Sequence, residues 1–428
     1  MTRRKLLRRV AIAGAAAAGA VLLRPRDEGS PYSPYFAAKN ALLRRAGPGR
    51  PVLFIDLDRL DANLVQVRKS LPPGKAFRVV IKSLPALGLV QRVMQALGTQ
   101  RLMVFHQPHL SALAVQLPQS DLLLGKPLPV AAAATFYREL PRTAFSPAAQ
   151  LQWLIDSEER LLQYRQLAAT LGQKLRVNLE IDVGLHRGGI ADPRQLPALL
   201  AIIAGAPGLL ELAGLMGYDA HVGKLPAVVE SRATSLHKVC ARYSEFVQVL
   251  AARIPAAQLA ALTLNGAGSP TFRLHGADSP LNELAAGSCL VKPTDFDLDL
   301  LADLQPAAFI AAPVLKALPG LTLPGLSSLG PAWAAWDPNR RRTFFIYGGL
   351  WMAQPEAPAG LRDNPLYGRS TNQAILNGSS RVTLAVDDYV FFRPTQSEKV
   401  LLEFGDLLAV RSTERGDEIE ARWPVLPS

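Results

Sequence analysis

The chain has 428 residues, long enough for two or three domains, and 49% of them are hydrophobic, which argues against a disordered polypeptide. Its net charge is +12, but seven of the 47 basic residues lie in the first 26 positions, where no acidic residue occurs. The rest of the chain carries 40 basic and 35 acidic side chains, an ordinary enzyme surface that argues against nucleic-acid binding.

The first 26 residues have the pattern of an export signal. A basic stretch precedes the apolar run 10–23, which is shorter than the ~20 residues of a membrane span. The paired Arg3 and Arg4, followed by leucines, resemble a twin-arginine export signal, and no clean Ala-x-Ala cleavage site follows the apolar run. We therefore expect residues 1–26 to direct the protein through the twin-arginine export machinery to the periplasm, or to anchor it in the membrane facing the periplasm. Residues 27–48 are interpreted as a linker or, alternatively, as the first ordered segment of the mature protein.

Short apolar runs then alternate with amphipathic stretches eight times. Such an alternation predicts a parallel (β/α)8 barrel over residues 49–300. A doubly wound open sheet is the alternative, but no G-x-G-x-x-G follows the first strand. The eight predicted strands are 77–83, 101–106, 121–127, 151–156, 175–182, 212–219, 262–269 and 282–288.

Residues 301–428 have a different character. Helical periodicity fades, and β-rich runs bounded by Pro and Gly take over at 341–350, 381–392, 399–412 and 418–426. The early run PVLFIDL at 51–57 has the same pattern and could pair with them. The predicted fold class is α/β, a TIM-type barrel followed by a C-terminal all-β domain.

Lys82 is the first candidate for chemistry. In a parallel barrel, functional groups lie at the C-terminal ends of the strands, and Lys82 follows the apolar run VVI at such an end. An amine that is desolvated there can attack a carbonyl group. The alternative is a lysine that simply leaves the strand for solvent.

Two glycine-rich turns follow the last two predicted strands. Gly268-Ser269 and Gly287-Ser288 combine free backbone N–H groups with a hydroxyl, and barrels often bind a phosphate at these two positions. Two ordinary turns between strand and helix are the alternative.

Strands five and six end in a further set of polar and aromatic residues. Arg187 lies in EIDVGLHRGG, and Tyr218 and His221 lie in GYDAH. A ring cofactor needs a flat group against its face and hydrogen bonds at its edge. Any one of these residues alone is more often structural. Their placement together with Lys82 and the glycine turns predicts a cofactor with a ring and a phosphate.

These segments resemble the fold-type III pyridoxal-phosphate (PLP) enzymes, in particular the D-threonine aldolase and D-serine dehydratase group, with alanine racemase more distant. The resemblance covers roughly residues 50–295 and rests on PVLFIDLDRLDANL, RVVIKS, EIDVGLHRGG, GLMGYDAH, NGAGSPT and NELAAGS. It implies a homodimer in which PLP forms a Schiff base with Lys82. The remaining cofactor contacts that it implies are Arg187 at the ring oxygen, Tyr218 and His221 at the ring, and Gly268, Ser269, Gly287 and Ser288 at the phosphate.

The C-terminal domain departs from that family. The aldolases and dehydratases carry a metal pair, His-x-Cys or His-x-Asp, where this chain reads FRPTQSE, and no histidine follows His275. Gln396 and Glu398 have the right spacing, but an amide is a poor metal ligand, which argues against a divalent metal. Arg393, Gln396 and Glu398 are candidates instead to bind a substrate carboxylate or to act as acid and base. A structural turn in which Arg393 pairs with Glu398 is the alternative.

The resemblance implies a PLP-dependent lyase, an aldolase or a dehydratase, that acts on D-β-hydroxy amino acids with Lys82 and His221 as catalytic residues. Two alternatives stay open. A racemase needs a second base on the opposite face of the ring, for which Tyr347 and Tyr367 are candidates. A non-catalytic exported protein that binds PLP or an amino acid is the other, since one fold hosts unrelated functions.

Overall fold

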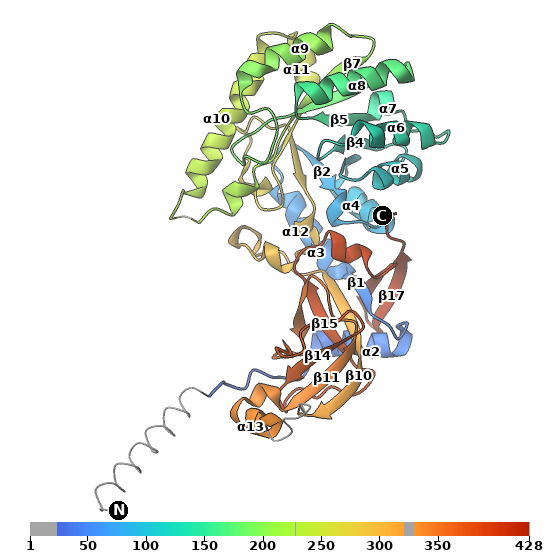
Figure 1. Cartoon of the computed structure of the whole chain (residues 1–428), viewed down its shortest axis with the longest axis vertical. Coiled ribbons are helices and arrows are strands. Elements are labelled where there is room, and N and C mark those ends of the chain that lie inside the picture. The colour runs from blue at the N-terminus through green and yellow to red at the C-terminus, as the bar shows by residue number, and fades with distance from the viewer. Residues whose placement is uncertain (1–23, 227, 321–328, 428) are drawn as a thin grey trace, which may run out of the picture. The chain divides into compact units, whose positions relative to one another are not determined.

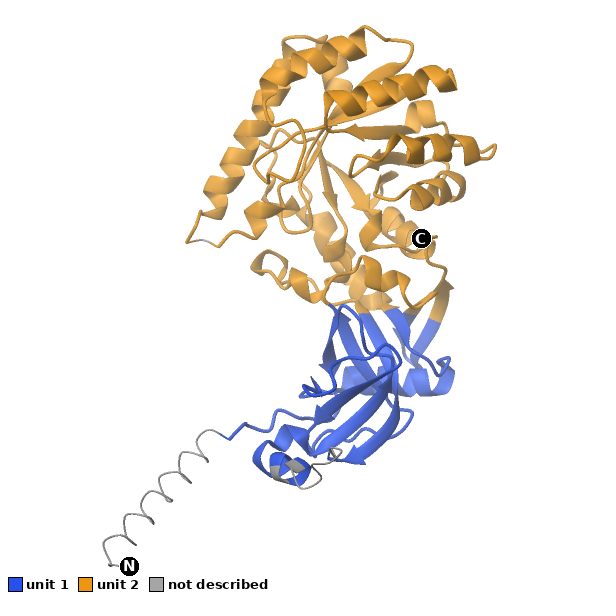
Figure 2. Cartoon of the chain, viewed as in Figure 1, with its two compact units in different colours: residues 1–54, 309–394, 410–419 blue, residues 55–308, 395–409, 420–428 orange. Residues whose placement is uncertain are grey.

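The structure is a computed structural model that describes residues 24–226, 228–320 and 329–427. The chain forms two compact units, which Figure 2 distinguishes by colour. One comprises residues 55–308, 395–409 and 420–428, and the other the described residues of 1–54, 309–394 and 410–419. Residues 1–23 of the expected export signal lie outside the described part. In that part, no helix combines the length and apolar character that crossing a membrane requires.

The first of these units contains a closed barrel of eight parallel strands, in which β9 pairs with β2. This confirms the predicted barrel. Every strand ends earlier than the sequence predicts, because the polar residues at the strand ends leave the hydrogen-bonded ladder and form turns. The strands are β2 (Ala76–Val80), β3 (Arg101–Val104), β4 (Asp121–Leu124), β5 (Leu151–Ile155), β6 (Leu175–Glu180), β7 (Leu210–Gly217), β8 (Thr263–Gly266) and β9 (Glu283–Ala286).

Helices follow the strands and lie around the outside of the barrel (Figure 1). Helix α3, for example, begins where the Asp56 side chain accepts a hydrogen bond from the Arg59 N–H, and it buries Leu60 and Leu64 on one face. Helix α4 ends at Gly98 in the left-handed conformation. The helices of this unit are α3 (Leu57–Ser70), α4 (Leu87–Leu97), α5 (Gln107–Gln116), α6 (Val130–Glu139), α7 (Pro147–Gln150), α8 (Glu158–Leu171), α9 (Leu196–Ala204), α10 (Arg232–Ala251), α11 (Ala256–Ala261) and α12 (Ser288–Val291).

A second sheet has nine strands in the order β13-β14-β11-β10-β1-β16-β17, with β15 beside β10 and β12 beside β15. The pairs that β10 makes with β11 and β15 are antiparallel, which confirms a β domain in addition to the barrel. The strands are β1 (Val52–Asp56), β10 (Ala308–Pro319), β11 (Arg342–Tyr347), β12 (Ala353–Ala357), β13 (Arg362–Asp363), β14 (Gln373–Gly378), β15 (Tyr389–Pro394), β16 (Leu407–Thr413) and β17 (Gly416–Trp423).

Several segments of this part differ from the sequence prediction. Only the end of the expected strand 381–392 is a strand, because a turn precedes it: Asp387 has a positive φ of 70°, and the Asp388 carboxylate accepts a hydrogen bond from the Ala385 N–H at 2.8 Å. Strand β14 was not predicted, since its sequence QAILNG does not alternate between polar and apolar residues. A short helix, α13 (Leu329–Trp336), also lies among these strands in the sequence.

Of the two interpretations of residues 27–48, the linker is wrong over most of the segment, because residues Pro34–Ala46 form helix α2, as an ordered first segment would. Ser33 caps this helix and Pro34 occupies its first turn, which are both common at helix starts. Phe36 and Leu43 are buried along it. A linker is solvated on all sides, whereas this helix packs an apolar face.

Candidate active site

A pocket lies at the C-terminal ends of the barrel strands, within the barrel unit. This position is typical of ligand sites in parallel barrels. The floor carries apolar side chains such as Val80, Met103 and Met216. Most of the sequence-predicted site residues line it: Lys82, Arg187, Tyr218, Gly268, Ser269, Gly287, Ser288 and Glu398.

Lys82 lies in a short 3-10 turn (Ile81–Ser83) directly after β2. Its Nζ is 2.7 Å from the Glu398 Oε1 and 4.7 Å from the centroid of the Phe105 ring. The Lys82 side chain is 36% exposed and that of Glu398 is 42% exposed. The amine therefore faces a carboxylate and an aromatic ring while staying accessible to a small molecule that enters the pocket.

Arg187 and Tyr218 form a second pair of contacting side chains in the pocket lining. The Arg187 guanidinium lies over the Tyr218 ring, 4.7 Å from its centroid. Burial raises the pKa of Tyr218 although Arg187 opposes this, so the phenol keeps its proton at neutral pH and can donate a hydrogen bond. A β-carbon at Gly268 would lie 2.6 Å from Cε2 of this ring. The absence of a side chain there allows the tyrosine to pack directly on the glycine turn.

Four serine hydroxyls gather around the second glycine turn. Ser83 Oγ and Ser288 Oγ are 2.8 Å apart, and Ser397 Oγ donates to Ser288 Oγ at 3.3 Å. Ser269 Oγ accepts from the Gly287 N–H at 3.2 Å. A β-carbon at Gly287 would lie 2.6 Å from the Val80 carbonyl oxygen, so the close approach of this turn to β2 requires glycine. Hydroxyls beside a turn of this kind suit an oxyanion such as a phosphate.

Ser83 and Ser397 were not predicted from the sequence. Each is the neighbour in sequence of a predicted residue, Lys82 or Glu398. Both contact Ser288, which lies 205 positions from Ser83 and 109 from Ser397, and one sequence gives no signal for contacts between such distant residues.

A buried pair supports the first glycine turn from behind. The Asp219 carboxylate accepts a hydrogen bond from Thr271 Oγ1 at 2.6 Å, and this hydroxyl accepts one from the Gly268 N–H at 3.0 Å. His275 Nε2 lies 2.6 Å from Asp219 Oδ2, and both side chains are 1% exposed. Burial opposes the charged imidazole, but Asp219, together with a smaller contribution from Cys240, outweighs it and raises the pKa of His275 to about 9. At neutral pH an ion pair therefore links this turn to the strand end that carries Tyr218.

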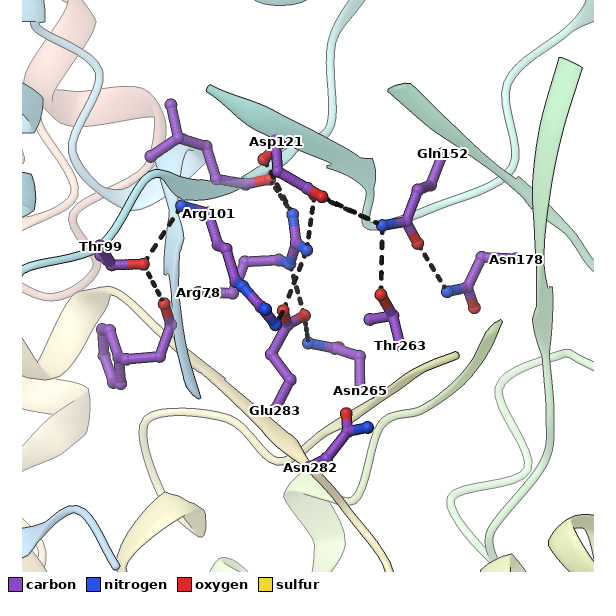
Figure 3. Close-up of polar contacts among 12 residues, drawn as sticks. Arg78, Thr99, Arg101, Asp121, Gln152, Asn178, Thr263, Asn265, Asn282 and Glu283 are labelled. Carbon is purple, nitrogen blue, oxygen red and sulfur yellow. Dashed lines mark hydrogen bonds and ion pairs between the residues drawn. The ribbon is translucent and has the colours of Figure 1, made fainter. Parts of the chain in front are cut away.

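Four charged side chains, Arg78, Arg101, Asp121 and Glu283, form a layer inside the barrel beneath the pocket, and we call it the ionic layer. Figure 3 shows their contacts. Arg78 and Glu283 are fully buried and point inward two residues before the pocket residues Val80 and Ala285 on the same strands.

The contacts within the ionic layer are close. Arg78 Nε is 2.5 Å from Glu283 Oε1, Arg101 Nη1 is 2.7 Å from Glu283 Oε2, and Arg78 Nη2 is 2.7 Å from Asp121 Oδ1. Burial alone would raise the pKa of Glu283, but the two arginines hold it below its usual range. Glu283 is therefore ionised at neutral pH.

Three predicted residues lie outside the pocket lining. His221 does not line it, although Tyr218 from the same strand end does. The Gln396 amide donates to Asp295 Oδ2 at 2.9 Å. Arg393 belongs to the other unit, where it is 7% exposed and its backbone pairs with Gln354. The roles that the sequence suggested for these three residues stay predictions.

The donor set at 396–398 does not resemble a metal site. Over residues 24–226, 228–320 and 329–427, no group of three or more His, Cys, Asp or Glu side chains is arranged to hold a metal ion. The argument against a divalent metal still rests on the residue types, because an amide and a lone carboxylate are a weak donor pair.

Residues 55–295 match the family described as alanine racemase, N-terminal domain. No curated protein matches the chain.

Solved structures share the fold over most of the chain. The D-threonine aldolase from Filomicrobium marinum superposes with a TM-score of 0.67 and 19% identity, covering 88% of this chain and 94% of that one. The D-threo-3-hydroxyaspartate dehydratase from Delftia sp. HT23 gives 0.65 and 16%, covering 90% and 99%. An alanine racemase from Bacillus anthracis with bound L-Ala-P gives 0.64 and 12%, covering 88% and 97%. At these identities the comparisons show the fold alone.

Proposed function

Because the chain belongs to the alanine racemase N-terminal domain family, a group of fold-type III PLP enzymes, we propose that it binds PLP in the barrel pocket and acts on D-amino acids. One observation carries this proposal: an accessible lysine, a glycine-turn hydroxyl cluster and a tyrosine paired with an arginine all line one pocket. The similar folds of a D-threonine aldolase and a D-threo-3-hydroxyaspartate dehydratase support the choice of substrate class.

The residues that line the pocket fit PLP in their chemistry. Lys82 would hold the cofactor covalently through Nζ, and the hydroxyls beside Gly287 would bind its phosphate. Arg187 would contact the ring oxygen, and Tyr218 would lie at the ring. When bound, PLP supplies an electron sink for negative charge that develops at the substrate Cα.

We propose further that the reaction is a lyase reaction on D-β-hydroxy amino acids, and the Lys82–Glu398 pair is the supporting observation. By the sequence resemblance, Glu398 would correspond to a metal ligand of related aldolases and dehydratases, and its carboxylate lies 2.7 Å from the Lys82 amine. A carboxylate there can accept the proton of a substrate hydroxyl at Oε1, while Lys82 Nζ can hold or deliver a proton beside it. Tyr218 and Arg187 would orient the ring and shield one side of the pocket from water.

The test is an assay of purified protein with D-threonine, D-serine and D-threo-3-hydroxyaspartate, with their L isomers as controls. We expect glycine plus an aldehyde, or an α-keto acid plus ammonia, from D isomers only. The assay is repeated with added divalent metal and with a chelator, and we expect neither to change the rate. Formation of the L isomer with exchange of the Cα proton in D₂O would identify a racemase, and inactivity of PLP-loaded protein on the whole panel would favour a binding protein.

We also propose export and a homodimer, as the sequence suggests. Exposed apolar side chains of the β unit, among them Tyr347, Leu350, Met352, Leu366 and Tyr367, support an association surface. Light scattering on purified protein would give the mass of the assembly. Fractionation of cells that carry wild type or an Arg3→Lys, Arg4→Lys variant would test export, since loss of the paired arginines should keep the protein in the cytoplasm.

A further inference from the structure

Asn265 is the polar side chain on the floor of the pocket. It lies in β8, lines the pocket and is 1% exposed. Its Nδ2 donates a hydrogen bond to Glu283 Oε1 at 2.8 Å (Figure 3). Its neighbours in the floor are Val80, Met103, Met216 and Ala285, which offer no side-chain hydrogen bond of their own.

The ionic layer fixes which way this amide points. Glu283 is ionised between Arg78 and Arg101, so its oxygens accept and cannot donate. A flipped Asn265 amide would set its oxygen against that carboxylate and lose a hydrogen bond. The nitrogen must face Glu283, and Oδ1 must face away from it. No described residue donates to this buried oxygen.

Asn178 Oδ1 also lacks a donor, but of these two asparagines Asn265 alone lines the pocket, so a ligand bound there can supply the missing donor to Asn265 Oδ1. In bound PLP, the roles proposed above assign the aldehyde carbon to Lys82, the ring oxygen to Arg187 and the phosphate to the serine hydroxyls. The polar atom that remains is the ring nitrogen, and it donates a hydrogen bond only when it is protonated.

We infer that Asn265, oriented by Glu283, accepts a hydrogen bond from the protonated ring nitrogen of PLP. The inference rests on the proposed function and adds a positioning residue to it. The chain Arg78, Glu283, Asn265 then polarises the amide oxygen toward the ring, because linked hydrogen bonds in a low-dielectric interior strengthen one another. A protonated nitrogen makes the ring the stronger electron sink.

The experiment uses holoenzyme loaded with PLP that is ¹⁵N-labelled in the ring, measured by NMR at pH 8, together with the dissociation constant of PLP. In wild type we expect the chemical shift of a protonated nitrogen. In Asn265→Leu, which keeps the size but removes the acceptor, we expect the shift of a neutral nitrogen and PLP affinity weaker by roughly tenfold or more.

Asn178→Leu is the matched control. Asn178 is fully buried, its Nδ2 donates to Gln152 Oε1 at 3.1 Å, and its Oδ1 has no donor among the described residues, but it does not line the pocket. We expect this variant to keep both the wild-type shift and the wild-type PLP affinity.

A neutral nitrogen in wild type would overturn the inference, as would an unchanged shift and affinity in Asn265→Leu. The NMR measurement on wild type tests the inference even if the variant does not fold. A second measurement on wild type uses 1-deaza-PLP, which has C–H in place of the ring nitrogen. This analogue should bind about tenfold more weakly than PLP, and equal binding would count against the inference. Failure of wild type to bind PLP covalently would overturn the proposed function as well, whereas normal binding with a neutral nitrogen overturns only the role of Asn265.

Discussion

The mouth of the barrel and the ionic layer beneath it both hold opposite charges in contact, but they differ in how completely those charges are satisfied. In the ionic layer, fully buried Glu283 accepts hydrogen bonds from Arg78, Arg101 and Asn265. At the mouth, Lys82 and Glu398 contact each other while each stays more than a third exposed. Charges with complete buried partners hold a structure together, whereas an accessible pair costs little to separate and is free to react.

The largest expected effect comes from Lys82→Ala. Turnover should fall at least ~10³-fold because the covalent attachment point of the cofactor is lost, while the melting temperature should change little. The absorption band of the lysine-bound cofactor and kcat measure the first effect, and a thermal melt measures the second. Lys126→Ala, an exposed lysine after β4, is the control and should behave as wild type. Retained turnover in Lys82→Ala would contradict the claim that the accessible pair at the mouth of the barrel carries the reaction.

Glu283→Gln tests the claim that the ionic layer stabilises the fold. It leaves Arg78 and Arg101 without their buried counter-charge, so the free energy of unfolding should fall by ~3–5 kcal/mol. Denaturant unfolding at pH 7 measures this. Asp61→Asn, which breaks the half-exposed pair with Arg92, is the control and should cost less than ~1 kcal/mol. Equal effects in the two variants would contradict the distinction between the ionic layer and surface pairs.

Glu398→Gln should lower activity and leave stability almost unchanged, in contrast to Glu283→Gln, which should lower stability. We expect kcat to drop by ~10²-fold because the proton acceptor beside Lys82 is removed, with unfolding free energy within ~1 kcal/mol of wild type. Glu403→Gln changes an exposed carboxylate of the same segment and should leave kcat unaltered. A Glu398→Gln variant with wild-type kcat would remove this residue from the mechanism.

The smallest effect concerns the His275–Asp219 pair and depends on pH. The folded-state pKa of His275, about 9, lies above its ordinary 6.5, so the pair stabilises the fold fully below pH 6.5 and loses this contribution as pH rises through 9. We expect wild type to lose ~2 kcal/mol more than His275→Asn between pH 6.5 and 9.5, as measured by denaturant unfolding at both values. Parallel pH profiles of the two proteins would argue against the ion pair.

The sequence predicted the barrel well because its signal is local. Each apolar run followed by a polar residue marks a strand and its end, and this pattern alone predicts that Lys82, Tyr218 and the glycine turns lie in one region. The β domain was harder to predict, since β14 lacks alternation and a turn at Asp387 interrupts an apolar run.

The residues that were missed depend on contacts between distant positions. Asn265 was an isolated polar residue between Leu264 and Gly266, and only its hydrogen bond to Glu283 gives it an orientation. The same holds for His275, whose positive charge depends on its contact with the buried Asp219 carboxylate. A polar residue at an inward-facing strand position is a signal that could have marked Asn265 in advance.

The most direct test of the account is to find where the cofactor is attached. Wild-type protein would be incubated with PLP, reduced with borohydride to fix the covalent link, digested and mapped by mass spectrometry. The account predicts a pyridoxyl-phosphate mass on the peptide that contains Lys82, in a ratio of one cofactor to one chain. Modification at a different lysine, or no modification at saturating PLP, would contradict it.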